Sequence, residues 1–238
     1  MNSHRESGGI SRVPGYPADP TKRNDSCIRY SSDPSPADVL VGIEGRGGWS
    51  MRIFTAPARP PLYTFGDFHI RHLRMSDAHA LAHHGDNPRI RRHLPDSFPS
   101  PYRVRDAKRF IAEMTKAPTA AAFTVASRDE AIGCVVLKAG RDINRLSAEI
   151  GYWLGEPFWR QGIMSAAVTF VTRFAFAELG FVRLYGTPFA SNAVSVRVLE
   201  NAGYRIEGIM RASALKDELI RDQMLLARVA APFDYFVS

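Results

Sequence analysis

The stretch AEIGYWLGEPFWRQGIMS, residues 148–165, decides how the rest of this chain is interpreted. Its first seven residues mix β-branched and aromatic side chains, which predicts a strand over 148–154 with a bulge-prone position at Gly151. A Gly-Glu-Pro run then breaks the strand pattern. Apolar residues at helical spacing follow Gly162 and continue to Gly180, a residue type that commonly ends helices. The stretch therefore predicts a strand, a loop and a helix.

The join between this loop and this helix is a candidate anion site. The first backbone N–H groups of a helix have no partner within the helix, and the helix dipole is positive there. The chain lacks both the Gly-Lys-Ser/Thr of a Walker loop and the GxGxxG of a dinucleotide fold. A glycine before a helix is also common in ordinary turns, so the motif alone leaves both interpretations open.

Length, composition and charge limit the possible classes of protein. A chain of 238 residues with 45% apolar residues can bury one sizeable core or two small ones. Two widely separated cysteines and the lack of a signal-peptide pattern favour a reducing cytoplasm, and no apolar run is long enough to span a bilayer. The net charge of +7 falls after residue 50, which suits an anionic ligand or an acidic partner. No nucleic-acid-binding motif is present.

The first part of the chain differs in composition from the rest. Residues 1–60 are rich in Pro, Gly, Ser and Asp without a strand or helix period, which predicts a disordered arm. The sequence IEGR at 43–46 resembles a protease site used in expression or arises by chance, and Met51 is a hypothetical alternative start. We expect one folded domain over 61–232 and a short tail over 233–238.

Patterning over the folded part predicts short strands and two or more helices on a mostly antiparallel sheet, which is an α+β sandwich. The expected elements are a strand or strand pair at 62–73, helices at 76–84 and 104–114, a hairpin at 123–138, the strand at 148–154, a helix after 162, a strand at 182–187, a helix at 191–201, and strands at 204–211 and 218–228. His79 and His83 have the spacing of a metal-binding pair. No acidic or cysteine ligand accompanies them, which favours a surface helix.

This order of elements and five of its motifs resemble the GCN5-related N-acetyltransferase (GNAT) superfamily, most closely the RimJ/RimL-like branch that acetylates the N-termini of ribosomal proteins. The similarity extends over about 62–228 and rests on FPSPY followed by Asp106-Ala107, AEIGYWL, WRQGIMSAA, NAVS at 192–195 leading to ENAGY at 200–204, and RDQML at 221–225. The resemblance implies a GNAT fold, which is a mixed, mostly antiparallel sheet of about seven strands with about four flanking helices and a V-shaped splay between the fourth and fifth strands.

The resemblance also implies acetyl-CoA as co-substrate and no metal. The family's pyrophosphate loop reads Gln or Arg, two residues, Gly, one residue, then Gly or Ala, and only Gly162 agrees strictly here. Backbone N–H groups can still cradle the pyrophosphate, and the residues that would supply them are Gln161, Gly162, Ile163, Met164 and Ser165. Arg160 is either a phosphate partner or a solvent-exposed loop cation.

In such folds the splayed strand edge pairs with the pantetheine arm of the co-substrate. The resemblance places this pairing at Trp153 and Leu154, with a backbone N–H near Leu154 polarising the acetyl carbonyl. The side chains of Tyr152 and Trp153 are expected to be ordinary strand aromatics. Asn192 is expected to bind pantetheine, to cap the following helix, or both.

Acyl transfer to an amine needs an acceptor for the amine proton and stabilisation of the departing thiolate. Glu149 is the candidate base, directly or through water, because it lies on the reactive strand, and its alternative role is a paired structural carboxylate. Many relatives have a tyrosine acid seven residues after the position of Asn192, where this chain has Leu199. Ser195 lies on the same helical face and is therefore expected to hydrogen-bond the thiolate or relay a proton through water.

These features predict an acetyl-CoA-dependent N-acetyltransferase that modifies a primary amine, foremost the N-terminal α-amine of a ribosomal or other protein. Direct transfer in a ternary complex is expected, because both cysteines are expected outside the site and no Ser-His-Asp arrangement is evident. The alternatives are an acetyltransferase for a small amine, such as an antibiotic or a polyamine, and a non-catalytic CoA-binding module. Positive charge over 89–93 favours an acidic or macromolecular acceptor. Monomer and homodimer both stay open.

Overall fold

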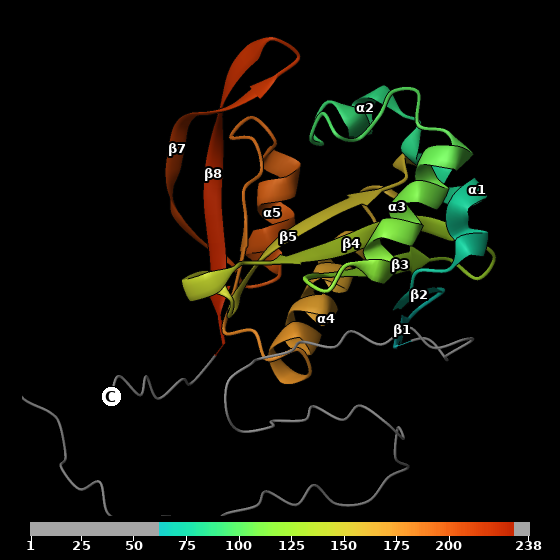
Figure 1. The fold of residues 1–238 in the computed structure, drawn as a ribbon, viewed down its shortest axis with the longest axis horizontal. Helices are drawn as coiled ribbons and strands as arrows, with labels where there is room; N and C mark the ends of the chain where they lie inside the picture. Colours follow the sequence, from blue (N-terminus) through green and yellow to red (C-terminus); the bar gives the residue numbers. More distant parts are fainter. Residues whose placement is uncertain (1–61, 231–238) are drawn as a thin grey trace, which may run out of the picture. The chain divides into compact units, whose positions relative to one another are not determined.

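One mixed sheet of eight strands runs through residues 62–230, the part of the chain that the computed structural model describes (Figure 1). The strand order is β1-β2-β3-β4-β5-β6-β8-β7. Neighbouring strands are antiparallel except β5 and β6, which are parallel. The strands are β1 (Tyr63–Phe65), β2 (Phe68–His72), β3 (Ala120–Ala126), β4 (Ala131–Ala139), β5 (Ser147–Leu154), β6 (Arg183–Gly186), β7 (Arg205–Lys216) and β8 (Leu219–Val229).

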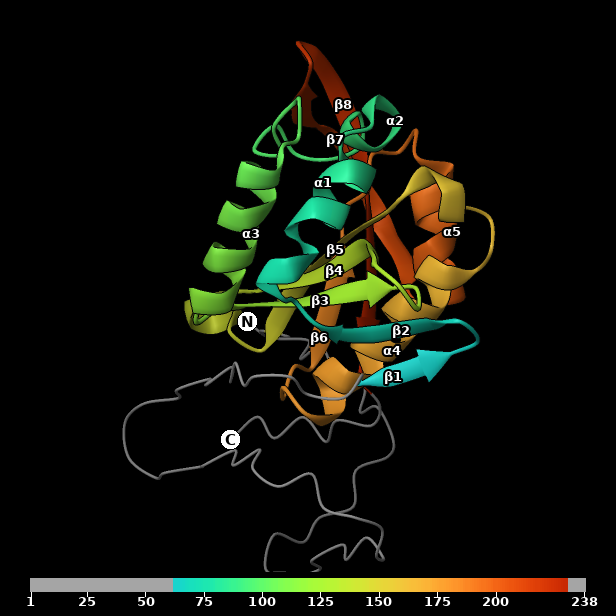
Figure 2. The ribbon, with the colours of Figure 1, turned by 90° about the vertical axis from the view of Figure 1, so that its right-hand side faces the viewer.

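Helices cover both faces of this sheet. They are α1 (Ala78–Gly85), α2 (Pro88–Arg91), α3 (Val104–Lys116), α4 (Ile163–Ala177) and α5 (Ala193–Asn201), with 3-10 turns η1 (Met75–Asp77), η2 (Asp142–Asn144) and η3 (Glu156–Phe158). Figure 2 shows α1 and α3 on one side of the sheet and α4 and α5 on the other. The main core packs α4 and α5 against one face, and a smaller core packs α1 and α3 against the opposite face.

These observations confirm the α+β class and the mixed, mostly antiparallel sheet. The sheet has eight strands instead of about seven because residues 62–73 form the β1–β2 hairpin. The bulge expected at Gly151 is wrong, since β4 and β5 keep one register from Gly133↔Leu154 to Ala139↔Ala148. The arm over 1–60, the alternative start at Met51, Cys27 and the tail over 233–238 lie outside the described residues.

The last two strands are longer than expected and meet in a tight hairpin. The expected strand over 204–211 extends to Lys216, with an irregularity in its pairing between Met210 and Ala214. Asp217 and Glu218 connect it to β8, and both have positive φ, 48° and 63°. Positive φ at both central residues is the conformation of a two-residue hairpin turn, which lets the strands continue to their ends.

The expected splay separates β5 from β6. Their parallel pairing covers only Ser147 to Glu149 on β5, and β6 then continues beside β8. Gln223 Nε2 donates to the carbonyl oxygen of Thr187 at 2.7 Å, and the N–H of Met224 donates to that of Pro188 at 2.9 Å. Pro188 itself has no N–H to offer β5. The splay therefore falls between the fifth and sixth strands, one later than expected because the hairpin adds a strand.

A buried ion pair fastens the start of the domain. Asp77 is 5% exposed, and its two carboxylate oxygens accept hydrogen bonds from the Arg71 guanidinium, each at 2.7 Å. The Thr124 hydroxyl donates to the same carboxylate at 3.0 Å. These contacts join β2, η1 and β3 beneath α1. A buried pair of this kind is costly to break from one side, because the remaining charge has no partner.

The first prediction concerns this ion pair. The variant Asp77→Ala leaves the Arg71 guanidinium buried without its carboxylate, so we expect the free energy of unfolding to fall by about 3–5 kcal/mol. Chemical denaturation measures this change. Asp67→Ala is the matched control, because Asp67 pairs with Arg128 at 3.0 Å and both side chains are mostly exposed. The control should change stability far less. Equal losses in the two variants would contradict the structural role of Asp77.

Candidate acetyl-transfer site

A cavity of about 660 Å³ lies over the α3 face of the sheet and extends through the splay to residues of α5. Alternation along the central strands sets its floor, since every second side chain faces the same side. The floor consists of Cys134, Val136 and Lys138 from β4, and Glu149, Gly151 and Trp153 from β5. A Cβ atom on Gly151 would meet nothing within 4 Å, so its hydrogen side chain leaves the floor open between Glu149 and Trp153.

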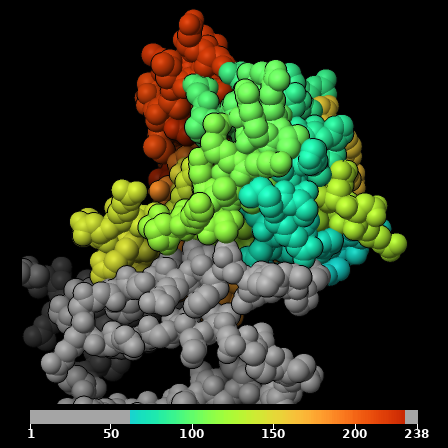
Figure 3. All heavy atoms as spheres, turned by 45° about the vertical axis from the view of Figure 1, so that its right-hand side comes forward, coloured from blue at the N-terminus to red at the C-terminus, as the bar shows by residue number. Residues whose placement is uncertain are grey.

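Two ion pairs connect the β7–β8 hairpin to the segment that precedes α3, and the first of them lies in the wall of this cavity. Lys216, 3% exposed at the end of β7, donates to Asp96 Oδ1 at 2.5 Å. Its hydrogen bond holds the pKa of the Asp96 carboxyl below its usual value. Arg91 Nη2 lies 3.1 Å from Asp217 Oδ1 at the hairpin turn. Figure 3 shows the β7–β8 hairpin beside the segment that contains α2 and α3.

Two arginines of the basic cluster at 89–93 form ion pairs with other segments. Arg89 forms an ion pair with Glu156, and Arg91 pairs with Asp217. His93 lines the cavity, and burial, followed by the neighbouring Arg92 and Arg221 charges, lowers its pKa. The Arg89 and Arg91 guanidinium groups thus connect protein segments, and the expected preference for an acidic or macromolecular acceptor stays a prediction.

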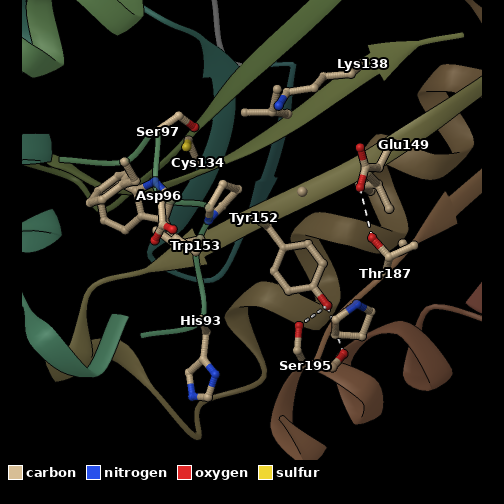
Figure 4. Close-up of a pocket in the computed structure, with 18 of the residues that line it drawn as sticks. His93, Asp96, Ser97, Cys134, Lys138, Glu149, Tyr152, Trp153, Thr187 and Ser195 are labelled. Atoms are coloured by element: carbon tan, nitrogen blue, oxygen red, sulfur yellow. Dashed lines mark hydrogen bonds between the residues drawn. The ribbon is translucent and has the colours of Figure 1, made fainter. Parts of the chain in front are cut away.

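The Glu149 carboxylate is half-buried where β5 and β6 separate. Its Oε1 accepts a hydrogen bond from the Thr187 hydroxyl at 3.0 Å, as Figure 4 shows. Burial, with the Glu149 charge as the second cause, raises the pKa of the neighbouring Tyr185. Thr187 follows the end of β6, and its own carbonyl is held by Gln223. The carboxylate is therefore oriented by a hydroxyl while remaining in the cavity lining.

Tyr152 and Ser195 meet across the splay (Figure 4). The Tyr152 hydroxyl donates to the backbone carbonyl oxygen of Ser195 at 2.9 Å, and the Ser195 hydroxyl donates to Tyr152 Oη, also at 2.9 Å. Burial raises the pKa of Tyr152, so its hydroxyl stays protonated. The Tyr152 side chain packs against the main core. It thus does more than the ordinary strand aromatic expected from the sequence.

Hydrogen bonds at both ends of β5 show which backbone groups face the splay. The Gly140 N–H donates to the Ser147 carbonyl oxygen at 2.8 Å, and the Gly155 N–H donates to the Ile132 carbonyl oxygen at 2.7 Å. Ser147 and Gly155 therefore bond on the side of β4. In an antiparallel pair, bonding alternates along the strand. Odd-numbered residues of β5 therefore face β4, and even-numbered residues face the splay.

This alternation separates the two residues expected on the open edge. The backbone of Leu154 faces the splay, and its carbonyl oxygen accepts from Trp159 Nε1 at 2.7 Å. The backbone of Trp153 faces Cys134 on β4, so it differs from the expectation. Tyr152, with the same parity as Leu154, takes that place. The Trp153 side chain instead contacts Phe98, with ring centroids 6.2 Å apart.

The loop before α4 has the geometry expected of an anion site. Arg160 and Gly162 both have positive φ, 62° and 74°, and the first hydrogen bond of the helix runs from the Ala166 N–H to the Gly162 carbonyl at 3.0 Å. The preceding helical N–H groups have no carbonyl within the helix to bond. Ile163 and Met164 bury their side chains, while Arg160 and Gln161 are exposed. The backbone N–H groups of Ile163, Met164 and Ser165 are thus available for a phosphate.

The structure also shows the positions of Asn192 and Cys134, the two other residues discussed from the sequence. Asn192 Oδ1 accepts the N–H of Ser195 at 3.2 Å and caps α5, so the capping role is the one seen. Cys134 was expected outside the site, yet its residue lines the cavity floor. It is 1% exposed, and burial raises the pKa of its thiol to about 12. Such a thiol is a poor nucleophile.

A family model decides the class of protein. The model for the acetyltransferase (GNAT) domain matches residues 67–205. The chain belongs to the GNAT acetyltransferase family. Acetyl-CoA is the co-substrate of acetyltransferases of this family, and the open edge of β5 with the free N–H groups at the start of α4 fits its pantetheine and pyrophosphate groups.

Individual relatives agree with this assignment. The Bacillus subtilis protein described as Probable N-acetyltransferase YjcK is 37% identical over 102 residues, 43% of this chain and 56% of that protein. The ribosomal-protein-serine acetyltransferase of Escherichia coli is 30% identical over 108 residues, 45% of this chain and 59% of that protein. The chain thus spans little more than half the length of these curated relatives.

The same fold occurs in a solved structure, the ribosomal-protein-S5-alanine acetyltransferase from Vibrio fischeri. It aligns with a TM-score of 0.63 and 21% identity, covering 70% of this chain and 95% of that one. At this identity the likeness shows the fold alone.

Residues 62–230 lack the features of two other classes of site. No group of three or more His, Cys, Asp or Glu side chains in this part of the chain could hold a metal ion. None of its helices combines the length and the apolar character of a membrane span.

Sequence reasoning missed the contacts that join distant segments. The Thr187–Glu149 hydrogen bond follows from the parallel pairing of β5 and β6, which the order of elements alone implies only loosely. The Lys216–Asp96 pair connects segments 120 residues apart, and no local pattern signals it. Tyr152 had a usable signal, because it alternates with Ile150 and Leu154 on the core face of β5.

The second prediction tests the α4 anion site with two glycines of one helix. Gly162 and Gly180 lie at opposite ends of α4, have φ of 74° and 70°, and would place an added Cβ in open space. Either change to Ala should lower the free energy of unfolding by about 1–2 kcal/mol through left-handed strain. Only Gly162→Ala should weaken CoA binding, because only this change strains the backbone beside the N–H groups at the start of α4. The Kd of CoA, measured by calorimetry, should rise about tenfold or more. Equal CoA affinity in both variants would show that the α4 start does not bind the phosphates.

Proposed function

We propose that this chain transfers the acetyl group of acetyl-CoA directly to a primary amine, and that the preferred acceptor is the N-terminal α-amine of a protein or peptide. The observation that carries the proposal is the Glu149 carboxylate. It lines the cavity at the point where β5 opens, and the Thr187 hydroxyl orients it at 3.0 Å. The strand that presents the base therefore also presents the edge for the co-substrate.

The co-substrate groups are assigned along β5 and α4. Backbone groups of Tyr152 and Leu154 face the splay and pair with the pantetheine arm, as a further strand would. The Leu154 N–H supports the acetyl carbonyl oxygen as negative charge develops there. The N–H groups of Ile163, Met164 and Ser165, with Gln161 and Gly162 before them, hold the pyrophosphate. Arg160, exposed beside them, is free to pair with a phosphate.

The chemistry requires one new bond and one broken bond. The neutral amine nitrogen forms a bond to the acetyl carbon, and the carbon–sulfur bond breaks. Glu149 accepts the proton that the amine loses, directly or through a water molecule. The electron pair of the broken bond stays on sulfur, where the Ser195 hydroxyl stabilises the thiolate by a hydrogen bond. Asn192 caps α5 and fixes the place of Ser195.

The preference for a protein α-amine rests on two supports. One of the relatives is named for acetylating a serine of a ribosomal protein, and it shares 30% identity over 108 residues. The cavity, about 660 Å³, is lined by aromatic residues such as Phe98 and Phe110 together with the Glu113 and Glu149 carboxylates. Carboxylates attract an ammonium group, and aromatic walls suit the first side chains of a peptide.

The acceptor class is tested with a panel of amines. It contains hexapeptides that begin with Ser, Ala or Thr, the same peptides with a blocked N-terminus, spermidine, and an aminoglycoside. Release of free CoA thiol is measured with acetyl-CoA at a saturating concentration. The proposal expects turnover with the open peptides and none with the blocked ones. Faster turnover with spermidine or the aminoglycoside assigns a small-amine acceptor, and CoA binding without turnover assigns a non-catalytic module.

The third prediction concerns the base. Glu149→Gln keeps the shape of the side chain but removes its capacity to accept a proton, so kcat should fall by about 10²- to 10⁴-fold. The Kd of acetyl-CoA, measured by calorimetry, should not change. Glu178→Gln is the matched control, because Glu178 is an exposed carboxylate that does not line the cavity. Its kcat should stay close to that of the wild type, and an equal loss in both variants would remove Glu149 from the role of base.

A further inference from the structure

The pair formed by Tyr152 and Ser195 has a hydrogen-bond arrangement that bears on the leaving group. Each hydroxyl has one proton. In the structure the Ser195 proton points to Tyr152 Oη, and the Tyr152 proton points to the Ser195 backbone carbonyl, both over 2.9 Å. The only proton of Ser195 is therefore committed to Tyr152. Ser195 cannot donate to a thiolate in this arrangement without losing a partner.

A second arrangement needs no movement of heavy atoms. The Tyr152 O–H bond rotates from the Ser195 carbonyl to Ser195 Oγ, which is already 2.9 Å away. The Ser195 proton is then free to turn toward the sulfur. The backbone carbonyl keeps its ordinary helical role within α5, so nothing buried loses its last partner. Burial raises the pKa of Tyr152 and keeps this donor protonated.

We propose that Tyr152 is a positioning residue for the departing thiolate: its hydroxyl holds Ser195 Oγ and donates to it while Ser195 donates to the sulfur. This inference rests on the function proposed above. Neither hydroxyl loses its proton overall, since both only redirect hydrogen bonds as the carbon–sulfur bond breaks. The electron pair of that bond stays on sulfur, and the amine proton goes to Glu149.

The position of the pair supports this role. Leu199 occupies the position at which the family resemblance implies a tyrosine acid in many relatives. Its side chain is 1% exposed and packs in the main core. The splay nevertheless receives a tyrosine hydroxyl, because Tyr152 supplies one from β5 on the opposite side of the gap. Both Tyr152 and Ser195 line the cavity. A donor chain of two hydroxyls stabilises a thiolate better than serine alone, because the first hydrogen bond polarises the second.

The fourth prediction is a mutant cycle on this pair, with the fastest acceptor of the amine panel. Tyr152→Phe removes only the hydroxyl, so kcat should fall about five- to tenfold, while the KM and the Kd of acetyl-CoA stay unchanged. Ser195→Ala should lower kcat about ten- to a hundredfold. The double variant should equal Ser195→Ala alone, because Tyr152 acts through Ser195.

Tyr204→Phe is the matched control. Tyr204 is 3% exposed in the same core, its hydroxyl bonds Thr172 Oγ1 at 2.8 Å, and neither of these two residues lines the cavity. This variant should lower the melting temperature about as much as Tyr152→Phe and leave kcat unchanged.

Three results would overturn the inference. The first is an unchanged kcat in Tyr152→Phe. The second is a raised KM for acetyl-CoA with unchanged kcat in that variant, which would give Tyr152 only a structural role at the splay. The third is a double variant in which the two losses of kcat multiply. Failure of the proposed function has a different signature, since the wild type would then transfer no acetyl group to any amine of the panel.

Discussion

The arrangement of this domain depends on one constraint, which is that β5 is antiparallel to β4 along its whole length but pairs with β6 only from Ser147 to Glu149. Beyond that point β6 stays with β8, because the Thr187 and Pro188 carbonyls bond to Gln223 and the Met224 N–H. The gap that results exposes backbone groups of β5 in the interior of a folded domain. Unpaired backbone groups in such a place are costly unless a ligand satisfies them.

The start of α4 completes this arrangement. Trp159 Nε1 donates to the Leu154 carbonyl at 2.7 Å, so the loop that leads into α4 is tied to the end of the open strand. The strand edge and the helix N-terminus are thereby held next to each other. One offers alternating donors and acceptors, and the other offers several N–H groups and a positive dipole. A ligand with amides at one end and phosphates at the other uses both.

Local patterns predicted the elements well, because their signals are short in range. Alternation predicted β5, Gly162 and Gly180 marked the ends of α4, and the Asn192 cap marked α5. The motifs around them were enough to indicate the family. The short helix α2 was missed, although Asn87 caps it and Pro88 occupies its first position, a typical helix start.

The roles of single residues were harder to predict, because they depend on contacts between distant segments. Glu149 was chosen from the sequence, but its partner Thr187 depends on the parallel pairing of two strands with a helix between them. Trp153 and Leu154 were treated alike, and the register with β4 separates them. The Cys134 thiol was placed outside the site because no sequence pattern shows that β4 lies next to β5 at Trp153.

The same alternation explains how one strand can serve both halves of the transfer. Glu149 is odd-numbered on β5, so its side chain lies on the α3 face, where the acceptor cavity is. Tyr152 is even-numbered, and its side chain passes to the α5 face, where it meets Ser195. The proposed proton acceptor, Glu149, and the tyrosine proposed to position the thiolate donor, Tyr152, are thus three residues apart in sequence but point to opposite sides of the sheet. In acyl transfer the amine adds to one face of the planar acetyl group and the sulfur then leaves the tetrahedral carbon in another direction, so a proton acceptor and a thiolate donor are needed in two different places. The pleat of one strand can supply both without any additional element.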